Sequence, residues 1–445
     1  MSMDLTKGSV PLHLFRMSGP MMIGIWSIMI MYFADSYFIS KLGVEPLAAV
    51  GFVLPMINLL SALCFSFGSA ASSHISRAYG ASDFATVKRY ASQALLIAFG
   101  HALVFCLFGF SLAEPVFRAL GATDALLQYI LEYADVWFYG CFLVIIPMVS
   151  NSIIRATGNT KMPGIIMLSV SVVNIVLDPL FIFGWGPIPA MGIQGAAVAT
   201  ITAYSVASLC SLYFLGIKLR YLSFSTLFYK PLEAWKGLLS LAYPALLTNL
   251  MAPLTIGLTT AFAAQYGVNA IAGLNVAMRL ETLVMVPVFG LASVLGPFIG
   301  QNMGAGEIGR LRYALKWAVR TIIIYCLGLY VGLLFLGSEL LSIFEITPAV
   351  EAEGLAYIKW VGWSYAALGI IIVTNASANV LGRPMVSMFI TLGRLFVVYV
   401  PLLFILKKYN GLEGVYLALG LSALVMALMA IYSWRHFLPK KLTSV

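Results

Sequence analysis

The sequence predicts an all-α integral membrane protein of twelve transmembrane helices, arranged in two pseudo-symmetric six-helix lobes around a central cavity. Three observations lead to this fold class. Of the 445 residues, 61% are apolar and 10% are charged, and the mean hydropathy is +0.96. The charged residues gather in short clusters between apolar runs of about 20 residues or more, the length of a spanning helix. The two halves of the chain also share Pro, Gly and Ala positions at a constant spacing.

The composition excludes several other classes of protein. An ordinary soluble domain is about 45–50% apolar and about a quarter charged, so a soluble enzyme and a disordered chain are both excluded. The net charge of +9 does not indicate nucleic-acid binding, because the basic residues are spread over many separate loops. The five cysteines lie inside apolar runs without CxxC spacing, so we expect neither a metal site nor a disulfide framework.

Twelve apolar runs between charge clusters and Gly/Pro breaks are candidate spans. They cover approximately residues 14–40, 47–75, 90–113, 128–154, 163–184, 195–216, 238–264, 271–299, 317–338, 354–381, 386–406 and 412–436. An even number of spans places both termini on one side. With that side in the cytoplasm, only Lys41, Arg118, Lys407 and Lys408 of the loop cations lie outside. The positive-inside rule therefore predicts a multi-pass protein of the cytoplasmic (inner) membrane with both termini in the cytoplasm.

The two halves of the chain align when residue i is placed beside residue i+224. The offset pairs Pro20 with Pro244, Gly43-Val44 with Gly267-Val268, Ala48 with Ala272, Gly80-Ala81 with Gly304-Ala305, and Asp83 with Glu307. A fixed offset over six spans indicates internal duplication, with an N-lobe at 1–217, a cytoplasmic linker at 218–237 and a C-lobe at 238–445. Because each unit has an even number of spans, both copies have the same orientation in the membrane. Such repeats are common among secondary carriers, so we favour an alternating-access transporter over a pore or an intramembrane enzyme.

Two carboxylates break this symmetry inside the predicted membrane spans. Asp35 in the first span has Thr259 as its repeat partner, and Asp178 in the fifth span has Val400. A charge at membrane depth costs at least about 2.5–3.5 kcal/mol, so such residues usually face a bundle interior or a wet cavity. We therefore expect the chemistry in the N-lobe.

Two further polar residues complete a candidate site with these acids. Asn174 lies four residues before Asp178 and so shares its helical face, and Thr200 in the sixth span adds a hydroxyl. Together these groups can share protons or supply hard oxygen ligands to a cation. Glu281 and Arg394 are interpreted instead as interfacial or paired structural charges. A weaker expectation is that cavity-lining side chains include Tyr37, Tyr139, Met31 and Met56.

At these residues the sequence resembles the multidrug and toxic compound extrusion (MATE) family of cation-coupled antiporters, in its prokaryotic DinF-like branch. The likeness covers nearly the whole chain. It rests on Gly19-Pro20, the ADSYFISKLG segment with Asp35, the RATGNTKMP loop from Arg155 to Pro163, and NIVLDPLFIF followed by GIQGAAVAT. The resemblance implies export of amphipathic or cationic drugs and dyes, driven by inward movement of protons or sodium ions.

The resemblance also implies residue roles. It places the cation-coupling site on Asp35, Asn174, Asp178 and Thr200, with Asp35 as the main carboxylate. From the asymmetry of the two acids we add the hypothesis that protonation lets the first span bend at Pro20 as a hinge. Another bacterial branch carries an acid at the position of about Ala252, so the C-lobe here departs from that pattern. The departure favours proton coupling, and sodium at the same four residues stays open. We expect a monomer without an enzymatic cofactor, whose partners are small-molecule drugs and membrane lipid and not nucleic acid.

Two rival functions are weighed against this one. A flippase for a lipid or lipid-linked saccharide belongs to a related duplicated-lobe family, but its phosphate-bearing substrates would favour cavity-facing cations, and the N-lobe offers acids. An intramembrane enzyme would need a nucleophile with a base, or a metal site. The four histidines are scattered without ligand spacing, at His13, His74, His101 and His436.

Overall fold

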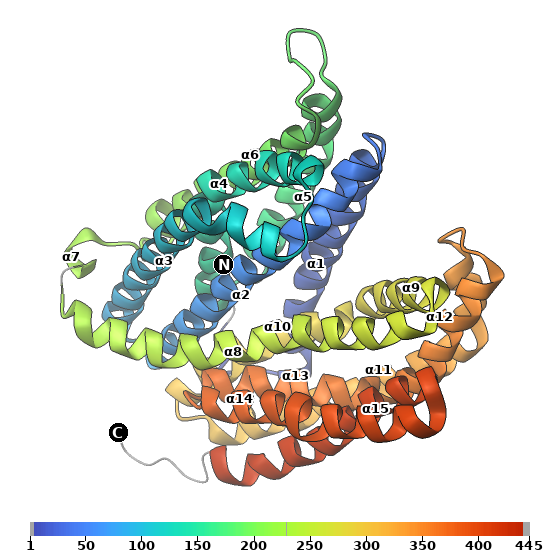
Figure 1. Cartoon of the computed structure of the whole chain (residues 1–445). Coiled ribbons are helices and arrows are strands. Elements are labelled where there is room, and N and C mark those ends of the chain that lie inside the picture. Colours follow the sequence, from blue (N-terminus) through green and yellow to red (C-terminus); the bar gives the residue numbers. More distant parts are fainter. Residues whose placement is uncertain (1–3, 228, 439–445) are drawn as a thin grey trace. The chain divides into compact units, whose positions relative to one another are not determined.

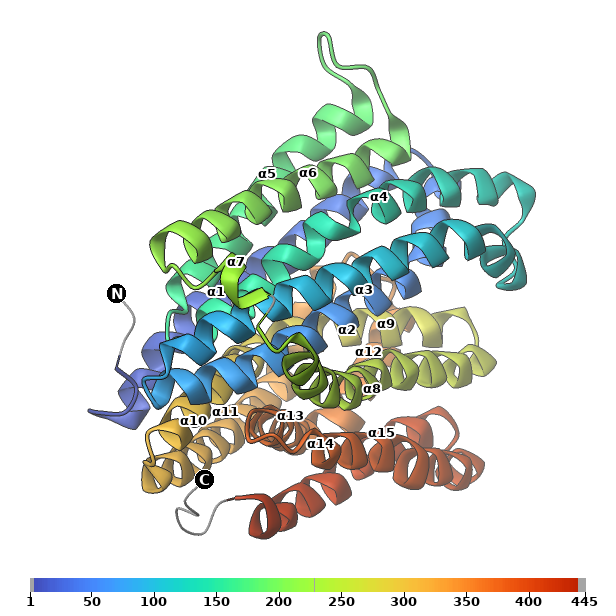
Figure 2. The same cartoon turned by 90° about the vertical axis from the view of Figure 1, so that its left-hand side faces the viewer.

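The computed structural model describes residues 4–227 and 229–438, and in this part of the chain the protein is built of helices joined by short connections (Figures 1 and 2). The first half contains α1 (Val10–Ser40), α2 (Val44–Gly80), α3 (Phe84–Ala119), α4 (Asp124–Ala156), α5 (Lys161–Phe183), α6 (Gly192–Tyr213), η1 (Phe214–Lys218) and the short α7 (Phe224–Leu227). The second half contains α8 (Pro231–Ala263), η2 (Ala264–Tyr266), α9 (Val268–Val284), α10 (Val286–Gly304), α11 (Ile308–Ser342), α12 (Pro348–Val361), η3 (Gly362–Ser364), α13 (Tyr365–Val380), α14 (Pro384–Leu392), η4 (Gly393–Tyr399) and α15 (Val400–Phe437). The predicted all-α membrane class is confirmed.

The helices account for twelve membrane crossings. Eleven helical segments of the described residues are long and apolar enough to span a bilayer, and the last of these, Pro384–His436, has 53 residues. At 1.5 Å per residue it would reach about 80 Å, roughly twice the thickness of a bilayer with its headgroups. Gly411 interrupts it with φ 57° and ψ −135°, a left-handed φ that glycine adopts without strain. The segment is therefore two spans.

The chain forms two compact units. One contains Gly19–Ala242, and the other joins Leu5–Ser18 to the chain from Tyr243 onward. The division falls inside α1 and again inside α8, shortly before Pro20 and Pro244, which the 224-residue offset relates. A proline inside a helix removes one backbone hydrogen bond and crowds the preceding turn, so each of these helices is weakened where it passes from one unit to the other.

Small residues allow the helices of the first unit to approach closely. α4 packs against α2, α3 and α6, and α6 also packs on α5. A Cβ added at Gly68 of α2 would lie 2.5 Å from Ser152 Oγ of α4, and one at Gly140 of α4 would lie 2.5 Å from the Ile201 side chain of α6. Lipid supplies no hydrophobic force between helices, so close van der Waals contact of this kind, together with interhelical hydrogen bonds, holds them together.

The segment after η1 folds back onto α3 (Figure 2). The Gln93 side-chain amide of α3 donates to the carbonyls of Thr226 (3.1 Å) and Leu227 (2.6 Å) and accepts from Trp235 Nε1 (2.6 Å). The backbone N–H of Ser223 donates to Ser92 Oγ at 3.0 Å. The face of α3 that carries Ser92 and Gln93 is thus covered by this chain's own linker.

The second unit is built around α13, which packs against α10, α11 and α15. The second unit also includes the N-terminal segment Leu5–Ser18, which Arg310 of α11 holds in place. The Arg310 guanidinium donates to the carbonyls of Leu5 (3.1 Å), Lys7 (3.1 Å) and Gly8 (2.7 Å). Asn302 of α10 donates to Leu5 O as well, at 3.2 Å. Charge-assisted bonds to three carbonyls fix the segment before α1 on this unit.

Candidate functional site

Three of the four predicted site residues form one hydrogen-bonded group between α5 and α6. The amide nitrogen of Asn174 donates to Asp178 Oδ1 at 3.0 Å and to Thr200 Oγ1 at 3.1 Å. Thr200 in turn donates to the Ala196 carbonyl, at 3.0 Å. All three side chains are buried, Asn174 and Asp178 completely. The spacing of four residues places Asn174 and Asp178 on one face of α5, and α6 supplies the hydroxyl opposite them.

Asp35 approaches this group from α1. Ser171 Oγ of α5 donates to Ser27 Oγ of α1 at 3.2 Å, which sets the two helices in register. As the first and fifth spans, they run in the same direction. Asp35 lies eight residues beyond Ser27 and Asp178 seven beyond Ser171, about 12 and 10 Å along their helices, so the carboxylates lie at nearly the same depth. The half-buried Asp35 is within electrostatic range of Asp178, but no hydrogen bond of the described residues joins them.

Two glycines make these helix contacts possible. A Cβ on Gly164 of α5 would lie 2.5 Å from the carbonyl oxygen of Pro20 in α1. A Cβ on Gly195 of α6 would lie 2.4 Å from the carbonyl oxygen of Phe181 in α5. Because a backbone carbonyl cannot rotate away, a larger residue at either position would separate the helices that carry the polar group.

The site has acceptor oxygens in excess of donors. Asp35 Oδ1, Asn174 Oδ1 and Asp178 Oδ2 are buried and receive no hydrogen bond within the described chain. A buried acceptor without a donor is unfavourable by about 1–3 kcal/mol. A proton on a carboxylate, or a hard cation among these oxygens, would satisfy it.

One buried residue near the acids was not predicted from the sequence. Tyr133 of α4 is only 2% exposed and lies within electrostatic range of both Asp35 and Asp178. A tyrosine inside an apolar span is so common that its type and position alone give no signal. Its phenol becomes noteworthy only when the packing of α4 is known.

The positions of the second unit that are equivalent to Asp35 and Asp178 carry no carboxylate. Thr259, the repeat partner of Asp35, is completely buried, and its hydroxyl is paired with the Tyr399 hydroxyl at 2.7 Å. Thr259 also donates to the Thr255 carbonyl at 2.8 Å. Asp178 is matched by the apolar Val400. The second unit forms the same part of the duplicated fold without a carboxylate at either position, so the fold alone does not require the acids of the first unit.

Glu281 and Arg394, two charged residues deep in the second unit, have neutral hydrogen-bond partners and lie within electrostatic range of each other. Glu281 Oε2 of α9 accepts a 2.6 Å bond from the Tyr357 hydroxyl of α12, and Tyr357 is 1% exposed. Arg394 lies in the π-helical turn η4 and donates to Ser422 Oγ at 3.4 Å. This is the arrangement expected of structural charges.

The residues expected to line a cavity differ in exposure within the first unit. Tyr37 and Tyr139 are exposed, with the Lys41 ammonium 4.9 Å from the Tyr37 ring centre. Met56 is half-buried. Met31 is 1% exposed and belongs to the hydrophobic core, so it packs inside the unit.

Two six-span units, with a buried polar site in one of them, define the class of protein as a membrane transporter of duplicated architecture. A sequence model of the MatE family matches residues 20–180 and again residues 244–405. The chain belongs to this family of transporters, and it is not an enzyme. The two matches begin 224 residues apart, at the offset read from the sequence.

Three similar proteins illustrate the family. The "FAD transporter" of Shewanella oneidensis is 36% identical over 94% of this chain and 93% of its own length. The "Multidrug export protein MepA" of Staphylococcus saprophyticus is 27% identical over 96% of this chain and 93% of its own. The crystal structure of the Vibrio cholerae MATE transporter VcmN in the bent form is 28% identical, covers 96% of this chain and 97% of that one, and has a TM-score of 0.90.

Proposed function

We propose that the protein is a cation-coupled exporter, driven by protons, whose coupling site is Asp35, Asn174, Asp178 and Thr200. The observation that carries the proposal is the excess of buried acceptor oxygens in the first unit, set against the neutral Thr259–Tyr399 pair of the second. The unpaired acceptor oxygens of this site can bind a cation without losing existing hydrogen bonds. Sodium coordinated by the same oxygens is the alternative coupling ion.

The four residues have different parts in the proposed cycle. Asn174 holds Asp178 and Thr200 in place by its two donated bonds. Asp35 is half-buried and accepts no bond at Oδ1, so it is the carboxylate that exchanges its proton and contacts a cationic substrate. Protonation from outside neutralises Asp35 and weakens its attraction for the substrate. Release of that proton to the cytoplasm completes the cycle.

Pro20 is the proposed hinge of this cycle. α1 carries Asp35, and it passes from one compact unit to the other immediately before Pro20. Bending there would move the part of α1 that carries the carboxylate relative to the part held by the second unit. The existence of a bent form of the similar transporter VcmN supports the proposal of a hinge in this chain.

The proposed substrates are amphipathic or cationic drugs and dyes; relatives that are named multidrug export proteins support drugs as the substrate class. A second candidate is flavin adenine dinucleotide, favoured by the 36% identical relative that is named a FAD transporter. This dinucleotide is an anion, so Asp35 would then act on the coupling ion alone and would not hold the substrate. The proposed location is the cytoplasmic membrane, with both termini in the cytoplasm, as a monomer.

Efflux from proteoliposomes tests the proposal and separates the candidates. Vesicles loaded with ethidium, or with flavin adenine dinucleotide, are given an imposed proton gradient or a sodium gradient alone. We expect ethidium efflux with the proton gradient and none with sodium alone. Efflux of the dinucleotide only would select the second candidate, and efflux without either gradient would overturn ion coupling.

A further inference from the structure

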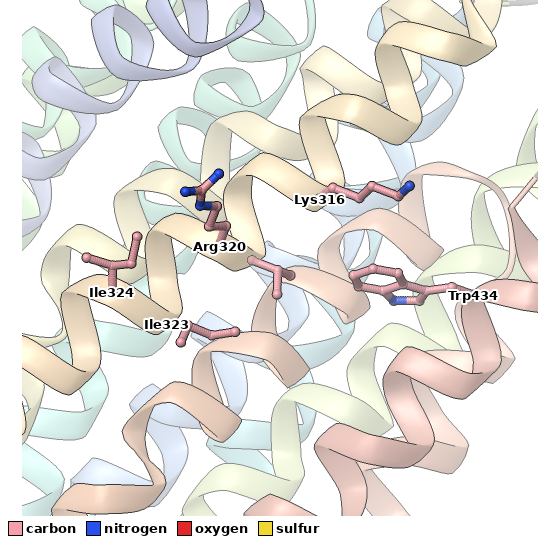
Figure 3. Close-up of a pocket in the computed structure, with 6 residues that line it drawn as sticks. Lys316, Arg320, Ile323, Ile324 and Trp434 are labelled. Atoms are coloured by element: carbon pink, nitrogen blue, oxygen red, sulfur yellow. The ribbon is translucent and has the colours of Figure 1, made fainter.

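A groove lies on the second unit between α11 and the last turns of α15. Its volume is about 300 Å³, and it is lined by Lys316, Val319, Arg320, Ile323, Ile324 and Trp434 (Figure 3). Trp434 extends from α15 toward the α11 side chains, and its indole N–H donates to Thr374 Oγ1 of α13 at 3.1 Å. The groove is therefore apolar along its length, with two cations on one wall.

The sequence-predicted spans put the groove near one membrane surface. The sequence places the ninth span at about residues 317–338, so Lys316 sits at its edge and Arg320 one turn inside. Trp434 comes from the end of the twelfth span, which lies on the same side of the membrane. Tryptophan and long basic side chains are typical of the interface between headgroups and acyl chains.

The two cations have no partner in the described chain. Lys316 and Arg320 are exposed, and neither takes part in an ion pair or a hydrogen bond there. By contrast, Arg118 is bonded to Glu114 and Asp124. Four residues apart on one helix, Lys316 and Arg320 are neighbours about 5–6 Å apart at Cβ, and like charges at this spacing are mutually unfavourable. An anion between them would reverse that effect.

The repeat partner of this surface is a docking face in the first unit. By the 224-residue offset, Lys316 corresponds to Ser92, Trp317 to Gln93 and Arg320 to Leu96. Ser92 and Gln93 are covered by the linker, through bonds from Ser223 and to the carbonyls of Thr226 and Leu227. In the first unit this surface carries neutral residues and is covered by the linker. In the second unit the equivalent surface carries two cations and has an open groove.

We infer that the groove binds one anionic glycerophospholipid from the adjacent membrane leaflet. The phosphate lies between the side chains of Lys316 and Arg320, and an acyl chain follows Ile323 and Ile324. Trp434 closes the groove at headgroup level. Basic pockets at the ends of transmembrane helices recognise lipid headgroups in this way. The last residues of the chain, which lie outside the described part, are a less suitable occupant of the groove. They carry Lys440 and Lys441, whose positive charge would be unfavourable beside Lys316 and Arg320.

Native mass spectrometry of the purified full chain tests the inference. Dioleoylphosphatidylglycerol is titrated against dioleoylphosphatidylethanolamine, which has the same acyl chains and no net charge. The wild-type protein should retain one phosphatidylglycerol in preference to the zwitterion. In the double variant Lys316→Gln/Arg320→Gln its apparent affinity should fall about twenty-five-fold, since each basic side chain near an anionic surface contributes roughly a fivefold factor.

Matched variants decide the source of any effect. Lys218→Gln/Arg220→Gln removes the same charges from exposed positions outside the groove and should bind like wild type. Ile323→Trp fills the groove, keeps both cations and should also lose the lipid. Unchanged phosphatidylglycerol binding in the Lys316 and Arg320 variant would overturn the inference. So would displacement of the lipid by millimolar inorganic phosphate, or a large gain in binding when the chain ends at Leu438.

Discussion

Replacing Gly164 by alanine is the sharpest test of how α1 and α5 are held together. The new Cβ would lie 2.5 Å from the Pro20 carbonyl oxygen and 3.0 Å from its carbon. A carbon and a carbonyl oxygen normally stay at least about 3.3 Å apart, so the helices must separate by about 0.8 Å. Overpacking of this kind costs about 1–3 kcal/mol. This destabilisation would arise at the contact between Gly164 of α5 and Pro20 of α1, the proposed hinge.

The measurement is thermal unfolding of the purified variant beside Gly100→Ala. Gly100 lies in α3, is exposed, and has open space around its added Cβ. Both changes replace a helical glycine by alanine and share the helix-propensity gain of about 1 kcal/mol, so their difference isolates the overpacking. Gly164→Ala should unfold about 1–3 °C below Gly100→Ala. Equal or higher stability of Gly164→Ala would refute the close α1–α5 contact.

Two further predictions use the repeat as an internal control. Asp83 caps α3 by accepting from the backbone N–H of Thr86 (3.0 Å) and from its hydroxyl (2.6 Å), whereas Glu307, its repeat partner, makes no such bond. Asp83→Ala should therefore lose about 1 kcal/mol of stability and Glu307→Ala almost none, by thermal unfolding at pH 7. The Thr86 bonds lower the pKa of Asp83, so its contribution is complete at neutral pH, begins to fall as the pH drops below about 4, and is lost only below the lowered pKa; an Asp83 effect that does not shrink as the pH falls through this range would contradict this. Tyr399→Phe leaves Thr259 bonded to its own helix and should not change the dependence of efflux on the proton gradient; a changed dependence would give the second unit a part in coupling.

Much of the architecture follows from local sequence pattern. Apolar run length predicts the spans because the bilayer sets a minimum helix length. The same pattern separates the last two spans near Gly411, where the structure has its break. The i, i+4 spacing of Asn174 and Asp178 predicts a shared face, and the structure shows a 3.0 Å bond between their side chains. Their role in coupling stays a prediction.

Other features depend on contacts between distant parts of the chain. Tyr133 lies near both acids, and Tyr357 binds Glu281 across 76 residues, but neither has a local sequence signal. The groove beside Lys316 depends on the position of Trp434, whose indole is bonded to Thr374 of α13. The hydrophobic periodicity of the sequence does not predict this contact. The donor deficit at Asp178 likewise appears only when every hydrogen bond around it is known.

The most direct test of the central claim compares proton-coupled efflux in two variants, each of which neutralises one acid of one unit. Asp35→Asn and Glu281→Gln proteins are reconstituted, and ethidium efflux and proton movement are recorded together under an imposed proton gradient. Both substitutions keep the size of the side chain, and the amide oxygen introduced by Glu281→Gln can still accept the Tyr357 bond. The account predicts that Asp35→Asn loses coupled efflux while Glu281→Gln retains it. Coupled efflux that survives in Asp35→Asn and disappears in Glu281→Gln would place the coupling acid in the second unit and contradict the account.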